Sequence, residues 1–266
     1  TKKKQKTKKT TKDYLEKKHS HPRDERIQFY PNEHKYLIDN NPDTISVSEL
    51  IERFFPEFDS ISAASNLNKN HELYGMDVEE IISKWKQNGT EKANLGTILH
   101  ADIENYYNNK VCNNNTLEYL YFQNFINKYP TMKPFRTEWR IFDEDLMIAG
   151  TIDMVYQKEN GDFYMFDWKR SEKVVDNLGN IKLSDPSNPY TKFAFGELNH
   201  FTDDSYNKYL LQQNIYRHIL EKKYNISISS MNLLILHPKY ENYHLVQLPK
   251  IEKEIKYIFE TSKLIT

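Results

Sequence analysis

Three segments rich in β-branched and aromatic residues follow one another between Phe135 and Arg170: FRTEWRIFD, LMIAGTIDMVYQ and DFYMFDWKR. Segments of this composition are typical of strands in one sheet. Two of them carry an aspartate within an otherwise apolar run, Asp153 in GTIDMVY and Asp167 in YMFDWK. A buried carboxylate costs several kcal/mol unless it is paired or binds a cation. Any fold built on these strands must therefore provide partners for both acids.

Helical patterns surround these strands. Upstream, turn residues predict a hairpin at 27–39. Apolar residues at helical spacing then predict helices at 46–55, 77–88, 90–109 and 116–128. Gly89 is expected to end the helix at 77–88. Downstream of the loop-like stretch 171–204, the pattern predicts a helix at 205–224, strands at 231–238 and 243–248, and a last helix at 251–265. This order predicts an α/β fold with a central mixed sheet flanked by helices, plus a helical N-terminal elaboration.

Charge is distributed unevenly along the chain. Residues 1–18 hold nine lysines against Asp13 and Glu16, while the whole chain carries a net charge of -1. We interpret 1–18 as a basic, flexible tail, either simply solvated or acting as a phosphate-binding arm. Residues 19–266 then form a single domain, with the hairpin and helices at 27–94 and the core at 95–266. The acidic body is compatible with a nucleic-acid partner, because carboxylates that bind a cation account for part of its charge.

Several classes of protein are excluded by composition. The single cysteine, Cys112, leaves no intramolecular disulfide and no four-cysteine zinc or iron–sulfur site within one chain. No apolar run reaches the ~20 residues that span a bilayer, so we expect no membrane partner and an intracellular location. Zinc-protease, phosphate-loop and nucleophile-elbow motifs are absent from the sequence. An oligomer is compatible with the sequence, which does not specify one.

The turn between the second and third strands decides whether the two acids meet. Asp167 and Lys169 are two residues apart, so they project to the same face of a strand. A two-residue turn would set Asp153 opposite Trp168, on the wrong face, whereas a three-residue loop would set it opposite Asp167. The three-residue loop is common when a glycine such as Gly161 takes its left-handed position. We therefore predict the three-residue loop.

Two acids and a lysine on one hairpin suggest a hydrolytic site. Carboxylates that reach one point favour a hard divalent cation, Mg²⁺ or Mn²⁺. A protonated lysine cannot bind that ion, but it can hold a water molecule or stabilise charge on a phosphorane. The alternative is an ion pair between Asp167 and Lys169 at a strand end. We would prefer that alternative for a single acid, but not for both acids and the lysine together.

This hairpin resembles the PD-(D/E)XK nucleases, in the branch of RecB-like and lambda-exonuclease-like enzymes. Upstream, GTILHADIE is similar to that branch's helix with a metal-binding histidine, here His100. Downstream, Gln212 and Tyr216 in LLQQNIYRHIL match its helix with a glutamine and a tyrosine. Gln213 is the neighbouring choice, and Gln212 is preferred because Tyr216 is one helical turn away. HKYLIDNNPDTISVSEL and FFPEFD are also similar to nucleases of large DNA viruses such as mimivirus.

The resemblance implies a restriction-endonuclease-like core and one or two Mg²⁺ or Mn²⁺ ions, without an iron–sulfur cluster. His100, Asp153 and Asp167 would bind the first ion, together with the backbone carbonyl of Trp168. Lys169 would orient or deprotonate the attacking water. These positions match the family's motifs, although Asp167 stands where many members have glutamate.

The remaining candidate residues have more than one interpretation each. Glu104, one turn from His100, could bind a second ion, orient a water or face solvent. Gln212 and Tyr216 could hydrogen-bond Lys169 or a phosphate, or simply pack. Glu138 could support the metal site or form an ion pair with Arg140 on the same strand face.

The expected function is metal-dependent hydrolysis of DNA, as an exonuclease acting on ends or single strands. The candidates for contact with nucleic acid are Arg140, Arg170, Lys208 and Arg217. Phe193, Phe195 and Phe201 in the following loop could stack on bases or belong to the core. The alternatives are a catalytically silent nucleic-acid-binding module of the same fold, and a metal hydrolase with another substrate, which would lack a basic groove.

Overall fold

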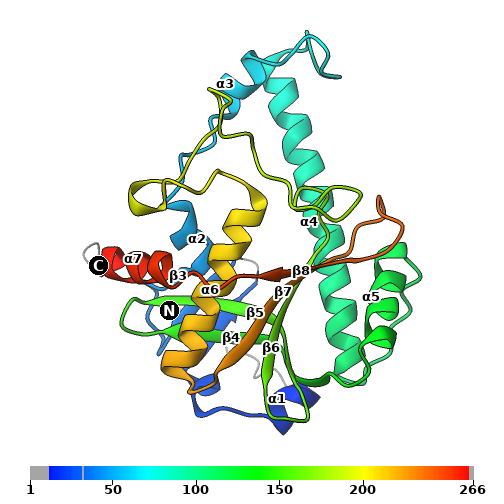
Figure 1. Cartoon of the computed structure of the whole chain (residues 1–266), viewed down its shortest axis with the longest axis vertical. Helices are drawn as coiled ribbons and strands as arrows, with labels where there is room; N and C mark the ends of the chain where they lie inside the picture. Colours follow the sequence, from blue (N-terminus) through cyan, green and yellow to red (C-terminus); the bar gives the residue numbers. More distant parts are fainter. Residues whose placement is uncertain (1–11, 32, 264–266) are drawn as a thin grey trace, which may run out of the picture.

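A mixed six-stranded sheet lies at the centre of the computed structural model, which describes residues 12–31 and 33–263 (Figure 1). Its strands run in the order β3-β5-β6-β7-β8, with β4 paired to β5. The pairs β3–β5 and β6–β7 are parallel and the others antiparallel. The strands are β3 (Ile45–Ser46), β4 (Lys133–Asp143), β5 (Ile148–Gln157), β6 (Phe163–Lys169), β7 (Ile228–Ile235) and β8 (His244–Leu248).

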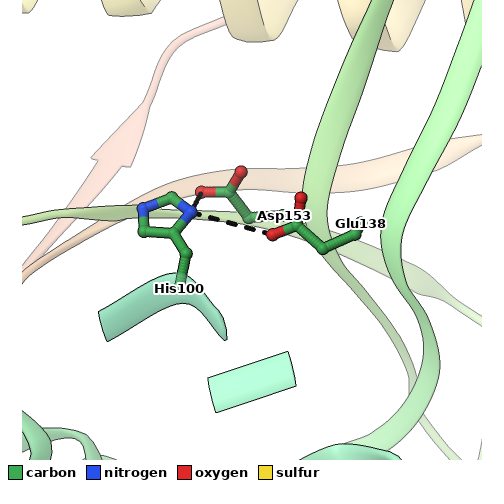
Figure 2. Close-up of side chains that lie close together, drawn as sticks. All are labelled: His100, Glu138 and Asp153. Atoms are coloured by element: carbon green, nitrogen blue, oxygen red, sulfur yellow. Dashed lines mark ion pairs between the residues drawn. The ribbon is translucent and has the colours of Figure 1, made fainter. Parts of the chain in front are cut away.

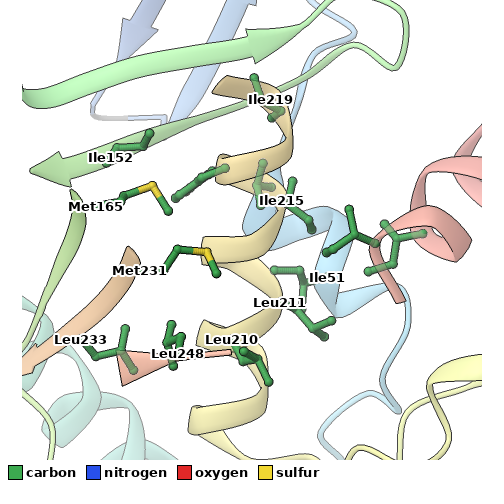
Figure 3. Close-up of a cluster of buried hydrophobic side chains, with 14 of the residues drawn as sticks. Ile51, Ile152, Met165, Leu210, Leu211, Ile215, Ile219, Met231, Leu233 and Leu248 are labelled. Atoms are coloured by element: carbon green, nitrogen blue, oxygen red, sulfur yellow. The ribbon is translucent and has the colours of Figure 1, made fainter. Parts of the chain in front are cut away.

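Helices cover both faces of this sheet. On one face lies α6 (Ser205–Lys223), with α2 (Val47–Glu52) and α7 (Glu252–Ser262) beside it. Figure 3 shows how strand side chains such as Met165 and Met231 pack there against Leu211 and Ile215 of α6. On the other face lie α4 (Val78–Tyr107) and α5 (Leu117–Lys128), which pack on aromatic side chains that include Tyr156, Phe166 and Trp168. The sheet is thus the middle of three layers.

The N-terminal elements surround this core. The hairpin of β1 (Ile27–Tyr30) and β2 (Lys35–Ile38) packs through Tyr36 and Ile38 on Phe142. In Figure 1, α3 (Ser60–Ser65) and the start of α4 project from the body as an arm, which has a small apolar cluster of its own. Three short helices complete the structure: α1 (Tyr14–Lys18), η1 (Pro22–Arg26) and η2 (Gly196–Leu198).

The expected α/β class and the mixed sheet flanked by helices are confirmed. The predicted break at Gly89 is wrong, because α4 continues through it as one 30-residue helix. One glycine costs a helix only ~1 kcal/mol, which packing at the C-terminal half of α4 outweighs. Part of the predicted tail is also ordered: Leu15 in α1 is buried, while residues 1–11 lie outside the described residues. Within the described ranges, no helix combines the length and apolarity that crossing a membrane requires.

Two glycines allow a matched test of this packing. A Cβ atom at Gly150 in β5 would lie 2.4 Å from a ring carbon of Tyr216 in α6, whereas one at Gly96 in α4 would meet nothing within 4 Å. We expect Gly150→Ala to lower the free energy of unfolding by about 1–3 kcal/mol through overpacking. Gly96→Ala should raise it by about 1 kcal/mol through helix propensity. Urea unfolding measures both, and a Gly150→Ala protein as stable as the wild type would contradict this packing.

Candidate functional site

The loop between β5 and β6 has the predicted three-residue form. The N–H of Lys158 donates to the carbonyl of Asp162 at 2.9 Å, and Gly161 takes a φ of 90°. The ladder then pairs Gln157 with Phe163 and continues to Met154 opposite Phe166. One further step of the same register places Asp153 opposite Asp167. The predicted three-residue loop is therefore confirmed, with the register that sets Asp153 opposite Asp167.

The site lies where β5 and β6 stop pairing. The last ladder pair is Met154 with Phe166, and β6 continues along β7 as far as Lys169. Beyond the last pair, the N–H of Trp168 donates to Oδ2 of Asp153 at 2.8 Å instead of to a strand carbonyl. The end of the ladder leaves space for the two carboxylates, and the N–H of Trp168 holds that of Asp153 in place.

Three potential metal ligands come together at this point: His100, Glu138 and Asp153 (Figure 2). Nδ1 of the histidine, on α4, lies 3.6 Å from Oδ2 of Asp153 and 3.7 Å from Oε1 of Glu138. One ligand atom from each residue lies within 4.8 Å of the other two. Nitrogen and carboxylate ligands of this kind suit Mn²⁺ or Mg²⁺.

Glu138 occupies its place through an unusual backbone conformation. Its φ is 45°, in the left-handed region, although it lies within β4. Such a conformation costs a non-glycine residue about 1–3 kcal/mol and is concentrated at functional sites. Among the described residues, Glu138 forms an ion pair with His100 and none with Arg140, whose guanidinium instead lies 5.9 Å from the ring centre of Phe29. Of the two interpretations of Glu138, the structure supports a place in the cluster.

The carbonyl of Trp168 orients the histidine. Nε2 of His100 lies 2.9 Å from this oxygen, and because a carbonyl only accepts hydrogen bonds, Nε2 carries the hydrogen. That arrangement leaves Nδ1 directed at Glu138 and Asp153, as Figure 2 shows. In this structure the carbonyl fixes the ring, as backbone carbonyls often do for histidine ligands, and its expected place as a metal ligand stays a prediction.

Asp167 is held outside the three-residue cluster. Its Oδ2 lies 2.7 Å from Nζ of Lys169, and its Oδ1 accepts a hydrogen bond from Nε2 of Gln213 at 3.0 Å. The ammonium of Lys169 also lies 4.3 Å from the ring centre of Tyr209. The expected ligand set of His100, Asp153 and Asp167 is thus corrected in this structure, where Glu138 takes the third place. Asp167 instead positions the lysine.

The choice of Gln212 over Gln213 was wrong. Gln212 donates to Oγ of Ser48 at 3.1 Å, away from the acids, whereas Gln213 is buried and reaches Asp167. Tyr209, Gln213 and Tyr216 share one face of α6, since they are spaced by four and three residues. This pattern was visible in the sequence, and it is the signal that would have identified Tyr209 and Gln213. Tyr216 packs on β5 at Gly150 and does not reach Lys169 through any contact between described residues.

Glu104 faces a small cavity next to the cluster. It lies on α4, one turn beyond His100, and the cavity of about 70 Å³ is also bordered by Asp13 and Glu138. Burial, and then the charges of Glu138 and Asp13, raise the pKa of Glu104 to about 7. Glu104 is therefore adjacent to the cluster, and Glu138 belongs to the cluster while also bordering this cavity.

The buried charges of the site strongly affect one another. Burial raises the pKa of Asp153, and it raises that of Asp167 to about 6 even though Lys169 opposes the shift. Burial lowers the pKa of His100, but the charges of Asp153 and Glu138 outweigh it and raise the net value to about 9. Burial also lowers the pKa of Lys169, which Asp167 more than reverses. In the absence of a bound cation, Lys169 and His100 thus provide the positive charge that balances the carboxylates of the site.

A cleft of about 730 Å³ opens over the cluster. His100, Glu138, Thr151, Trp168 and Lys169 border its centre. One side is formed by the face of α4 that carries the small side chains of Gly89, Ala93, Gly96 and Thr97. Cations at the rim include Lys92 and Lys173, and the rest of the lining comes from the β1–β2 hairpin, residues 170–173, Ser205, Tyr209 and His237.

The residues expected to contact nucleic acid are mostly engaged elsewhere. Arg217 is buried and pairs with Glu221 and Glu252, and Lys208 pairs with Glu52 and Asp203. Arg170 borders the cleft, but its Nε lies 2.6 Å from a carboxylate oxygen of Glu118. Each of these three cations thus has an acidic partner, and of the three Arg170 borders the cleft. Arg140 remains exposed.

The aromatic residues of the 171–204 loop also lie elsewhere. Phe201 is buried in the main core, and Phe193 forms an isolated bridge with Thr202. The N–H of Phe195 donates to the carbonyl of Phe54. None of the three phenylalanines borders the cleft. Of the three, Phe201 belongs to the core, whereas Phe193 is half-buried and Phe195 is exposed.

Comparisons with known proteins give little further information. No family model matches the chain, and no curated protein matches it. Among solved structures, the chain is similar to the one titled "Crystal structure of SSO0001", with 15% identity and a TM-score of 0.34. That match covers 85% of this chain and 78% of the other. A likeness at this level carries no argument, so function must be inferred from the site.

The two adjacent glutamines of α6 provide a matched pair of variants. Gln213→Ala removes the amide that donates to the buried carboxylate of Asp167, and we expect it to lower the free energy of unfolding by about 1–3 kcal/mol. Gln212→Ala removes a hydrogen bond at the surface and should cost about 0.5 kcal/mol or less. Urea unfolding of both variants is the measurement. Equal costs for the two changes would show that the rotation of α6 is wrong.

The raised pKa of His100 predicts a pH dependence of stability in metal-free protein. Because its pKa is about 9 in the folded state and near 6.5 otherwise, the stabilisation is complete below pH 6.5 and is lost as the pH rises through 9. We expect the free energy of unfolding to fall by about 1–3 kcal/mol over that range. The fall is limited because the His100 side chain is 28% exposed and solvent screens its charge. His100→Gln should remove this component. Urea unfolding in EDTA from pH 6 to 10 checks it, and parallel profiles for the two proteins would refute it.

Proposed function

We propose that this protein is a metal-dependent deoxyribonuclease of the PD-(D/E)XK type, with a restriction-endonuclease-like core. One observation carries the proposal: the β5–β6 hairpin carries Asp153, Asp167 and Lys169, and its Asp153 forms one cluster with His100 and Glu138 beside a cleft. The order of motifs along the sequence, with His100 first and the α6 glutamine last, supports the same class.

The ligand cluster fits a divalent cation. His100, Glu138 and Asp153 would hold it, and the imidazole favours Mn²⁺ while the carboxylates also suit Mg²⁺. The hydrogen bond from Nε2 to the Trp168 carbonyl fixes the ring with Nδ1 available. Oδ2 of Asp167 is paired with the ammonium of Lys169, so this carboxylate would join the cluster only if Lys169 moved. Glu104 and Glu138 are the carboxylates that would hold a second ion at the adjoining cavity.

Lys169 is the residue that would act on the reacting phosphate. Its side chain borders the cleft, and the carboxylate of Asp167 and the ring of Tyr209 hold the ammonium in place. As a cation, it can donate hydrogen bonds to a phosphate oxygen or to the attacking water and stabilise the developing negative charge. A bound divalent ion would supply Lewis acidity, which polarises the phosphate and activates water.

DNA cleavage and its dependence on Lys169 test this proposal. We expect the wild-type chain to degrade labelled linear DNA with Mg²⁺ or Mn²⁺, and EDTA to stop it. Lys169→Ala should lower the rate by about 100-fold or more, because a positioned electrostatic group contributes ~3–4 kcal/mol to such a barrier. Lys158→Ala, the same change at the distal end of the hairpin, is the control and should cleave normally.

The possible outcomes separate the alternatives. Equal cleavage by the wild type and Lys169→Ala, purified in parallel, would mean that the hairpin is not the active site. Binding of DNA without cleavage in either metal would indicate a silent module of the same fold. Circular DNA included in the same assay distinguishes an exonuclease, which leaves it intact, from an endonuclease.

A further inference from the structure

One wall of the cleft is a cluster of aromatic rings outside the catalytic hairpin. Phe29, His34 and Tyr36 all belong to the β1–β2 hairpin and border the cleft. The ring centre of Phe29 lies 4.6 Å from that of Tyr36 and 5.4 Å from that of His34. Their partners elsewhere hold them in place, since Phe29 packs on a buried cluster and the hydroxyl of Tyr36 lies 2.9 Å from Oγ1 of Thr151. We call this set the aromatic wall.

Space for a flat group is available beside these rings. Gly89 and Gly96 are both on the face of α4 that borders the cleft, and a Cβ atom at either would meet nothing within 4 Å. Glycine costs a helix ~1 kcal/mol relative to alanine, and no packing against the described residues requires it at either position. The two glycines therefore leave free volume in the cleft that larger side chains would fill.

The charge of the cleft rim suits a polyanion. Lys92 and Lys173 border the cleft, and Lys239 lies next to it through a shared acid. Glu172 is the partner of both Lys92 and Lys239, at 3.3 Å and 3.2 Å. Two lysines thus share one carboxylate and Lys173 adds a third positive charge at the cleft, which leaves an excess of positive charge beside the site. Phosphates of a nucleic-acid strand would balance it.

We infer that the cleft binds an unpaired nucleotide of a single DNA strand, whose base stacks on the aromatic wall. The inference rests on the proposed function, because the phosphodiester next to that base is the one that would reach the acids and Lys169. Bases in a duplex are already stacked and paired, so their faces are not available to the rings. A cleft of about 730 Å³ is also in the size range of sites for small ligands, not of a duplex groove.

Binding of labelled oligonucleotides tests the wall independently of cleavage. Fluorescence anisotropy in Ca²⁺ would compare single-stranded DNA, blunt duplex DNA and single-stranded RNA of one sequence. We expect single-stranded DNA to bind more tightly than the other two. Phe29→Ala should weaken its binding about 5- to 100-fold, which corresponds to the loss of one base stack. His34→Ala, at an exposed position, tests the same wall without disturbing the core.

Matched variants separate stacking from general packing. Phe29→Leu keeps an apolar side chain without a flat ring and should bind weakly, whereas Phe29→Tyr should bind as the wild type does. Tyr30→Ala removes an aromatic residue from the same strand that does not border the cleft, and it should leave binding unchanged. Urea unfolding of each variant confirms that it is folded.

Each result bears on a separate claim. Unchanged affinity in both Phe29→Ala and His34→Ala would overturn the wall as a stacking site, even if the protein cleaves DNA. Equal affinity for blunt duplex, or tighter binding of RNA, would overturn the assignment to single-stranded DNA. Wall-dependent binding with no cleavage in Mg²⁺ or Mn²⁺ would retain the binding site and refute the nuclease.

Discussion

Two carboxylates buried on adjacent strands are the constraint on which the site depends. Asp153 and Asp167 face each other just beyond the last ladder pair of β5 and β6, where neither is solvated freely. Their mutual repulsion and desolvation would be costly if they had no partners. The surrounding structure supplies one set of partners for each: the Trp168 N–H and His100 for the first, Lys169 and Gln213 for the second.

These partners come from both layers of helices, which explains why the site lies within the sheet and not at a loop. α4 brings His100 from one face, and α6 brings Tyr209 and Gln213 from the other. The backbone of Trp168 links Asp153 to His100, since its N–H donates to the carboxylate and its carbonyl accepts from the imidazole. Rigid elements therefore fix the ligands before any cation or substrate binds, which reduces the reorganisation that binding requires.

The strained backbone of Glu138 also fixes a ligand in place before a cation binds. Its positive φ brings a third carboxylate to a site that already holds two acids, against both conformational and electrostatic cost. A cation would offset that repulsion, and the open cleft above gives one access. Stability and the proposed chemistry thus oppose each other here, as they commonly do where charge is concentrated for catalysis.

The sequence alone determined every strand except β3, most of the helices and the loop that sets Asp153 opposite Asp167, because alternation and turn length are local properties. It also placed Asp167 and Lys169 on one face. Only the tertiary structure decided that Gln213, not Gln212, faces the acids, since the rotation of α6 depends on which apolar residues pack on distant strands. The same holds for Glu138 as a ligand and for the acidic partners of Lys208 and Arg217. Those contacts join elements far apart in the chain, and local pattern carries no information about them.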